Sequence, residues 1–154
     1  MGRLCPRVAA SLCTLVTLIG LACVFDSPEN PDPLTINGTW RFTEAMVDPL
    51  RSLACTDTGV YDISQVRDSF FGTYQQTGVC TSPQGALSNR QRGTVTGGRI
   101  LGNRIQFHVP ENCDYNGALT GSPPAQVAGK TYCILRDANG TVVYSYEGEW
   151  QAIR

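Results

Sequence analysis

The sequence has 154 residues and a formal net charge of −1, with 42% hydrophobic and 16% charged residues. This apolar content is too high for a disordered chain, and the length is enough for one domain with a buried core. Because the charges nearly cancel and basic residues form no run, we expect no nucleic-acid partner.

Residues 1–22 have the composition of a secretory signal peptide. Arg3 and Arg7 give a positively charged start, and residues 8–22 carry no charge. This apolar run is too short to cross a bilayer comfortably, and it ends in small residues. We therefore expect residues 1–22 to direct export and to be removed.

Residues 19–23, Ile-Gly-Leu-Ala-Cys, resemble the lipobox of bacterial lipoproteins. The resemblance implies that Cys23 carries a lipid and anchors the protein in the cell envelope, as a periplasmic or cell-surface lipoprotein. The sequence departs from the pattern at Gly20, where leucine is usual. Gly20 and Ala22 also satisfy the small-x-small rule of ordinary signal peptidase, so plain secretion stays open.

The number of cysteines favours lipidation. The chain has seven cysteines, and two of them, Cys5 and Cys13, lie within residues 1–22. An odd set then remains for an oxidising compartment: Cys23, Cys55, Cys80, Cys113 and Cys133. A lipid on Cys23 accounts for the odd thiol, whereas secretion would leave Cys23 free or paired with another chain. Residues 23–34 are acidic and rich in proline, so we expect a flexible linker there.

From residue 35 onward, polar and apolar residues alternate, and turn residues close each segment. Such a period of two predicts strands, and no segment has the longer period of a crossover helix. We expect eight strands at 35–44, 59–65, 69–79, 90–98, 104–109, 114–121, 126–136 and 141–153. The fold class is therefore all-β, an eight-stranded antiparallel up-and-down (meander) barrel that fills a single domain at 35–154.

A short helix is expected between the first and second strands. Asp48 can cap a helix, Pro49 suits its first position, and residues 50–54 continue with helix-compatible residues. We expect this segment, 48–54, to act as a lid over the open end of the barrel.

The spacing of the cysteines predicts two disulfides. Cys55 and Cys80 lie at equal distances from the predicted turn at residues 67–68, and Cys113 and Cys133 flank Pro123 in the same way. Residues directly opposite each other in a hairpin are close enough for a disulfide, so we expect the pairs Cys55–Cys80 and Cys113–Cys133. Because no two of these cysteines are close in sequence and the chain has one histidine, we expect no metal site and no cofactor.

Gly38-Thr39-Trp40, on the first strand, resembles the G-x-W motif of the calycin superfamily, which includes the lipocalins. The resemblance implies a lipocalin-like barrel whose closed end is plugged by Trp40, with a basic side chain, here Arg154, lying across the indole. Trp with a stacked guanidinium would seal the narrow end of a closed meander. Alternatively, Trp40 is an ordinary core aromatic of an unrelated sandwich.

The last strand has a clean period of two, which places Tyr144, Tyr146 and Trp150 on one face. An inward aromatic face could line a cup for a small apolar ligand, with tyrosine hydroxyls as polar groups. The lining candidates are Phe42, Tyr74, Ile105, Phe107, Tyr144, Tyr146 and Trp150. The alternative is that these side chains fill the barrel completely, as eight strands permit.

Catalysis has little support, so we expect no enzyme. His108 is the sole imidazole, and its neighbours Phe107 and Val109 suggest that it faces outward. We expect most carboxylates in turns or on solvent faces, namely Asp48, Asp57, Asp62, Asp68, Glu111, Asp114, Asp137, Glu147 and Glu149.

The expected function is that of an exported, lipid-anchored, lipocalin-like protein that binds a small, largely apolar ligand. The alternative is a structural or interaction lipoprotein with a solid core that acts through its surface. An enzyme of this fold, the third possibility, would need His108 or a buried carboxylate inside a pocket.

Overall fold

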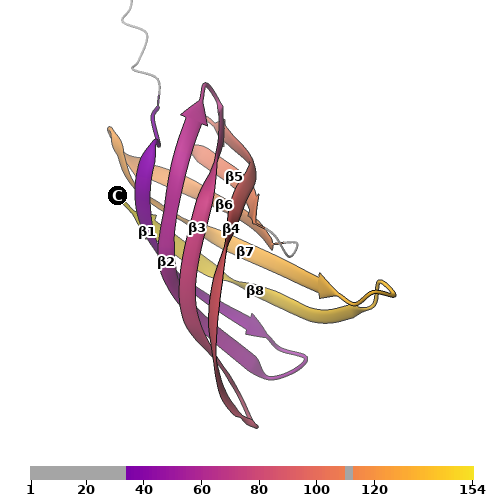
Figure 1. The fold of residues 1–154 in the computed structure, drawn as a ribbon. Coiled ribbons are helices and arrows are strands. Elements are labelled where there is room, and N and C mark those ends of the chain that lie inside the picture. The colour runs from indigo at the N-terminus through magenta and orange to yellow at the C-terminus, as the bar shows by residue number, and fades with distance from the viewer. Residues whose placement is uncertain (1–33, 110–112) are drawn as a thin grey trace, which may run out of the picture. The chain divides into compact units, whose positions relative to one another are not determined.

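The structure is a computed structural model, and it describes residues 34–109 and 113–154. Eight antiparallel strands form a closed barrel in which each strand pairs with its sequence neighbours and β8 pairs with β1 (Figure 1). The strands are β1 (Gly38–Asp48), β2 (Leu53–Val66), β3 (Ser69–Ser82), β4 (Gly85–Leu101), β5 (Arg104–Val109), β6 (Cys113–Gly121), β7 (Pro124–Arg136) and β8 (Val142–Ile153). The predicted all-β meander barrel is confirmed.

The expected signal peptide, Cys23 and the linker up to residue 33 lie outside the described residues. In the two described ranges, no helix is long and apolar enough to cross a membrane.

The strands extend further at one end of the barrel than the alternation predicts. We call this the open end, because the β1–β2, β3–β4 and β7–β8 hairpins project from it and splay apart (Figure 1). β4 begins at Gly85 instead of residue 90, because β3 and β4 are joined by only two residues, Pro83 and Gln84. The Ser82 hydroxyl stabilises this turn by accepting from the Gln84 amide at 3.2 Å and donating to the Gly85 carbonyl at 3.2 Å.

The predicted helical lid at residues 48–54 is wrong, since the described residues contain no helix. β1 runs to Asp48 and β2 starts at Leu53, so only residues 49–52 connect the two strands, and they form a turn. Asp48 does accept from nearby amides, as a helix cap would, but the segment closes into a hairpin. Ser52 has a positive φ of 52°, which reverses the chain into β2.

Asp48 also joins this hairpin to β8. Its carboxylate accepts from the amides of Leu50 at 3.0 Å and Arg51 at 3.2 Å, from the Arg51 guanidinium at 3.1 Å, and from the Ser145 amide at 3.2 Å. The side chain of Asp48 has no exposed surface. Burial alone would raise the pKa of Asp48, but the Ser145 amide and then Arg51 hold that pKa below its ordinary value.

The half of the barrel away from the hairpins is packed solid with aromatic rings. Phe42 stacks on Tyr61 at 4.3 Å, Phe107 stacks on Tyr115 at 4.8 Å, and Trp150 meets Phe107 edge-on at 5.4 Å. The void left among these side chains is about 20 Å³, room for roughly one water molecule. This closed end therefore supplies the hydrophobic core of the barrel.

Trp40 lies at the bottom of this core, where its indole N–H donates to the Ile36 carbonyl at 2.8 Å. The guanidinium of Arg154 is 5.9 Å from the centre of the indole ring, and it donates to the carbonyls of Asn37 and Thr35. The Gln65 amide completes the plug by donating to the Leu34 carbonyl and accepting from the Ile36 amide. The segment before β1 is thereby held across the closed end.

Both predicted disulfides are confirmed. Cys55 pairs with Cys80 across β2 and β3, and Cys113 pairs with Cys133 across β6 and β7. Each bridge joins directly opposite residues of one hairpin, with Cα atoms 4.0 Å apart. Because the two hairpins lie on different sides of the barrel, the bridges constrain two separate parts of its wall near the open end.

We expect the substitution Asp48→Asn to destabilise the barrel by about 2 kcal/mol at pH 7, because it weakens four partly buried hydrogen bonds to a charged acceptor. The lowered pKa means that the ionised carboxylate stabilises the fold above the ordinary value of 3.8, and this contribution is lost as the pH falls through the folded-state pKa. Urea unfolding of both proteins at pH 7 and pH 2 measures the difference, which should shrink in acid. The exposed Glu147→Gln is the control, and an equal loss for both variants would contradict the assignment.

Candidate functional site

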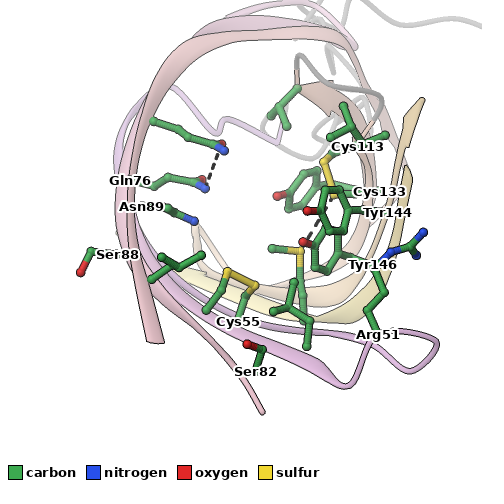
Figure 2. Close-up of a pocket in the computed structure, with 18 of the residues that line it drawn as sticks. Arg51, Cys55, Gln76, Ser82, Ser88, Asn89, Cys113, Cys133, Tyr144 and Tyr146 are labelled. Carbon is green, nitrogen blue, oxygen red and sulfur yellow. Dashed lines mark hydrogen bonds between the residues drawn. A yellow bond between two sulfur atoms is a disulfide. The ribbon is translucent and has the colours of Figure 1, made fainter. Parts of the chain in front are cut away.

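A cavity of about 880 Å³ opens between the hairpins at the open end, above the solid core (Figure 2). Strands from all sides of the barrel contribute to its wall. The lining residues are Met46, Arg51, Leu53, Cys55, Gln76, Cys80, Ser82, Gln84, Leu87, Ser88, Asn89, Gln91, Val109, Cys113, Tyr115, Cys133, Leu135, Tyr144 and Tyr146. We call this cavity the cup.

Sulfur atoms and aliphatic side chains make up much of the cup wall. Both disulfides line the cup, and the Met46 sulfur lies 4.0 Å from the sulfur of Cys133. The inward position of the cysteines follows from the alternation, because Cys55 and Cys133 have only 3% and 5% of their surface exposed. These groups offer polarisable apolar contacts to an occupant.

Two facing sides of the cup have different chemistry (Figure 2). On β3 and β4, the Gln76 amide donates to the Gln91 amide oxygen at 3.3 Å, and Asn89 points inward beside them. On β8, four strands away around the barrel, Tyr144 and Tyr146 stack with ring centres 5.7 Å apart. The cup therefore presents hydrogen-bonding amides on one side and flat aromatic surface on the other.

Two acidic side chains lie beneath the cup. Glu44 on β1 and Asp57 on β2 are directly opposite each other in the strand register, and both face inward. Their exposed fractions are 4% and 1%. Tyr115, which lines the cup, donates its hydroxyl to Glu44 at 2.9 Å, whereas Glu44 itself does not line the cavity.

The register makes room for the Asp57 carboxyl group. The residue opposite it on β3 is Gly78, and a Cβ atom there would lie 2.1 Å from an Asp57 oxygen. Any larger residue at position 78 would therefore displace the carboxyl group. Gly78 in turn pairs with Asn89 of β4, whose amide lies next to Asp57. We call Glu44, Asp57, Asn89, Tyr115 and Thr131 the polar layer.

Burial dominates the electrostatics of the polar layer. It raises the pKa of Glu44 to about 7, against the opposing effects of hydrogen bonds from Tyr115 and Thr131, and the neighbouring Asp57 raises it further. Burial also raises the pKa of Asp57, while Asn89 favours its charged form. The hydroxyls of Tyr61 and Tyr115 have raised pKa values too, first through burial. The next causes are Tyr115 and then Glu44 for Tyr61, and Glu44 for Tyr115. Near neutral pH, Glu44 therefore exists in both protonation states.

The seven lining candidates divide between the cup and the core. Tyr144 and Tyr146 line the cup. The other five are buried in the packed half or at its border with the polar layer, and none of them lines the cup: Phe42, Tyr74, Ile105, Phe107 and Trp150. Trp150 is held there by its indole N–H, which donates to the carbonyls of Asn116 at 3.0 Å and Lys130 at 3.2 Å.

Sequence reasoning missed most of the polar groups of the site. Two carboxylates expected in turns or on solvent faces, Asp48 and Asp57, are fully or almost fully buried. Glu44 was overlooked although it continues the inward series of Trp40 and Phe42 at a spacing of two. The alternation that placed the aromatic residues could therefore have found the acidic ones.

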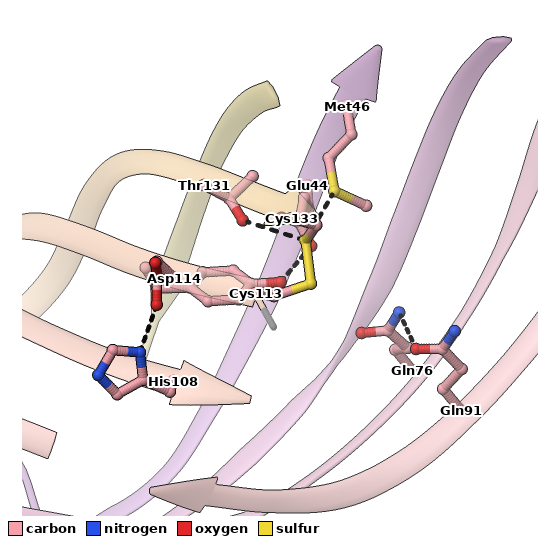
Figure 3. Close-up of a disulfide and its surroundings, with 10 residues drawn as sticks. Glu44, Met46, Gln76, Gln91, His108, Cys113, Asp114, Thr131 and Cys133 are labelled. Atoms are coloured by element: carbon pink, nitrogen blue, oxygen red, sulfur yellow. Dashed lines mark hydrogen bonds and ion pairs between the residues drawn. A yellow bond between two sulfur atoms is a disulfide. The ribbon is translucent and has the colours of Figure 1, made fainter. Parts of the chain in front are cut away.

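His108 lies outside the cup. Its side chain is 59% exposed, and it forms an ion pair with Asp114 on the neighbouring strand β6 (Figure 3). Within the described ranges, no group of three or more His, Cys, Asp or Glu side chains could hold a metal ion. The groups that line the cup are amides, hydroxyls, aromatic rings, sulfur atoms, aliphatic side chains and the Arg51 guanidinium.

We expect Glu44→Gln to remove a pH-dependent loss of stability. Because the folded-state pKa of Glu44 is raised, burying this side chain destabilises the wild-type fold least below its ordinary pKa of 4.5. The destabilisation grows as the pH rises through about 7. The variant should thus gain relative stability from pH 4.5 to pH 8, by at most about 3 kcal/mol. Urea unfolding with intact disulfides measures this change, with Glu147→Gln as the exposed control. An unchanged pH slope in Glu44→Gln would show that Glu44 is not the group responsible.

No family model matches the sequence, and no curated protein matches it. Among solved structures, a chain described as "De novo design of a fluorescence-activating beta barrel" is similar to this one, with 15% sequence identity. The match covers 78% of this chain and 95% of that chain, with a TM-score of 0.34. At this distance the likeness adds nothing to the barrel topology already described.

Proposed function

We propose that this chain is an exported, lipid-anchored protein of lipocalin-like organisation that binds a small molecule in its cup without chemical change. The observation that carries the proposal is the cavity of about 880 Å³, since small-molecule sites have volumes of about 300–1,000 Å³. Its floor and walls come from paired strands and two disulfides, so the cavity is largely formed before a ligand arrives.

The lining supports a ligand with an apolar body and a polar end. Leu53, Leu135 and the disulfides provide apolar contacts, and Tyr146 provides an aromatic face. Gln76 and Asn89 add hydrogen-bonding groups deeper in the cup (Figure 2). This combination modifies the expected, largely apolar ligand, because such a ligand would leave the buried Oδ1 of Asn89 without a partner.

The cavity favours ligand binding over the alternative of a solid-core protein that acts through its surface. The closed end does have a solid core, where the remaining void is about 20 Å³. The open end does not. His108, the only imidazole, lies on the outer wall, so it takes no part in the cup.

Export is supported by the two disulfides, which indicate an oxidising, extracytoplasmic environment. With Cys55, Cys80, Cys113 and Cys133 paired, Cys23 is the one cysteine left over beyond residue 22. A lipid on Cys23 would use that thiol and tether the barrel to the envelope.

We expect the purified protein to bind N-phenyl-1-naphthylamine, a neutral apolar fluorophore, with an increase in the emission of the probe. Gln91→Trp places an indole inside the cup and should weaken this binding by roughly tenfold or more, because it fills the space that the probe needs. Thr94→Trp is the matched control, since Thr94 is exposed on the same strand and does not line the cup. Titration of each protein with the probe measures both effects.

Two results of this titration would contradict the proposed function. One is the absence of binding by the wild-type protein with both disulfides intact. The other is equal affinity of the two tryptophan variants, which would place the probe outside the cup. Circular dichroism spectra of the variants show whether each substitution leaves the barrel folded.

Lipid anchoring gives a separate prediction. Intact-mass measurement of the protein isolated from its own membrane fraction should show an acyl-sized increment, which peptide mapping should assign to Cys23. Cys23→Ser should release the protein from the membrane fraction. An unmodified Cys23 in the wild-type protein would remove the anchor from the proposal and leave the ligand-binding cup unaffected.

A further inference from the structure

Three carboxylate oxygens in the polar layer have no hydrogen-bond partner of good geometry. They are Oε1 of Glu44 and both Oδ atoms of Asp57, all inaccessible to solvent. The Asn89 amide lies close enough to favour the charged form of Asp57, but its own Oδ1 is buried without a partner. Unpartnered buried carboxylates are costly, so their presence calls for a partner that the described residues do not supply.

The described residues that line the cup provide no free positive charge for this layer. Arg51 is the one cationic residue among them, and it is engaged at the rim. Its guanidinium pairs with Asp48 at 3.1 Å and lies over the Tyr144 ring at 5.2 Å. The acidic pair of Glu44 and Asp57 therefore has no counter-charge facing it from the cup wall.

Individual side chains on the floor of the cup contact both the cavity and the acidic pair, Glu44 and Asp57. Tyr115 lines the cup and donates to Glu44, and its hydroxyl also interacts with Tyr61 and Thr131. Asn89 lines the cup and lies beside Asp57, and Gln76 lines it nearby. A donor placed on this floor would meet acceptors that are backed by negative charge, in a protein interior where such charge is weakly screened.

We propose that the ligand of the cup is an amine, whose protonated nitrogen lies on the floor at Tyr115, Gln76 and Asn89 with Glu44 and Asp57 as its counter-charge. This inference rests on the proposed function and names the chemical class of the ligand. The ammonium group supplies the positive charge that the polar layer lacks, and it can donate to the unpartnered Oδ1 of Asn89, which lines the cup. The apolar body of the amine then extends along the disulfides toward Tyr144 and Tyr146 at the mouth.

The charge of the polar layer depends on every group that faces Glu44. Asp57 and Tyr61 face it from β2, Tyr115 from β6 and Thr131 from β7. The two tyrosines stay neutral in the accessible pH range, since burial raises their pKa values, and Thr131 does not titrate. Glu44 and Asp57 thus set the charge of the layer, which becomes more negative as the pH rises through about 7.

Calorimetric titration with three probes of equal shape tests the proposal: 4-phenylbutylamine, 4-phenylbutan-1-ol and 4-phenylbutanoate. At pH 8 we expect the amine to bind roughly tenfold more tightly than the alcohol, and the carboxylate to bind most weakly. At pH 5 the preference for the amine should shrink, because Glu44 is then mostly protonated while the amine keeps its charge.

The double variant Glu44→Gln, Asp57→Asn separates charge from shape. Its amides fill nearly the same volume as the carboxyl groups, so the alcohol should bind as it does to wild type while the preference for the amine disappears. Glu147→Gln, which removes an exposed carboxylate of β8, should keep that preference. Thermal unfolding of all three proteins confirms that the affinities refer to folded barrels.

The outcomes distinguish this inference from the proposed function. Equal affinity for amine and alcohol at pH 8, or an amine preference that survives in the folded double variant, would overturn the inference and leave a ligand-binding cup. Failure of all three probes together with the neutral naphthyl fluorophore would overturn both. A preference for the carboxylate would also overturn the inference, because it would require a positively charged floor.

Discussion

Hydrogen bonding between β1 and β8 closes the sheet, and the rest of the structure depends on that closure. Seven residue pairs, from Arg41 with Ile153 to Val47 with Glu147, join the two strands. Once the sheet is closed, every second side chain of each strand faces a shared interior and has no route to solvent except through the open end. At each level along the barrel axis, the inward side chains therefore decide whether the barrel is solid or hollow.

The inward residues change from large and aromatic to smaller and polar along the barrel axis, and this change separates a solid half of the barrel from a hollow half. Along β1 the inward series runs from Trp40 through Phe42 to Glu44, and then to Met46 at the cup. Large rings fill the closed end, whereas amides, sulfur atoms and the two stacked tyrosines of β8 surround a hollow at the open end. Gly78 permits the transition, because a side chain there would collide with the Asp57 carboxyl group. The cup thus follows from the smaller inward side chains together with the splayed hairpins of the open end.

The same alternation explains what the sequence could and could not predict. Strand order and disulfide pairing are local properties of hairpins, so turn residues and the spacing of Cys55 and Cys80 were sufficient for them. The two-residue alternation shows whether a side chain faces inward. How far along the barrel axis that side chain lies depends on the tilt of the strands, which the alternation does not show. Tyr146 and Trp150 therefore share a face of β8, yet only Tyr146 lines the cup. Asp48 misled the helix prediction because one carboxylate can cap a helix or close a hairpin.

The polar layer is the one part of the described interior that works against the stability of the fold. Methyl and aromatic groups in place of Glu44 and Asp57 would extend the core and avoid the desolvation of two carboxyl groups. The two disulfides and the Asp48 hairpin anchor lie in the open half, where they compensate for the missing core. The fold therefore strengthens the wall around the cavity, and it places two buried acids beneath that cavity at a cost in stability.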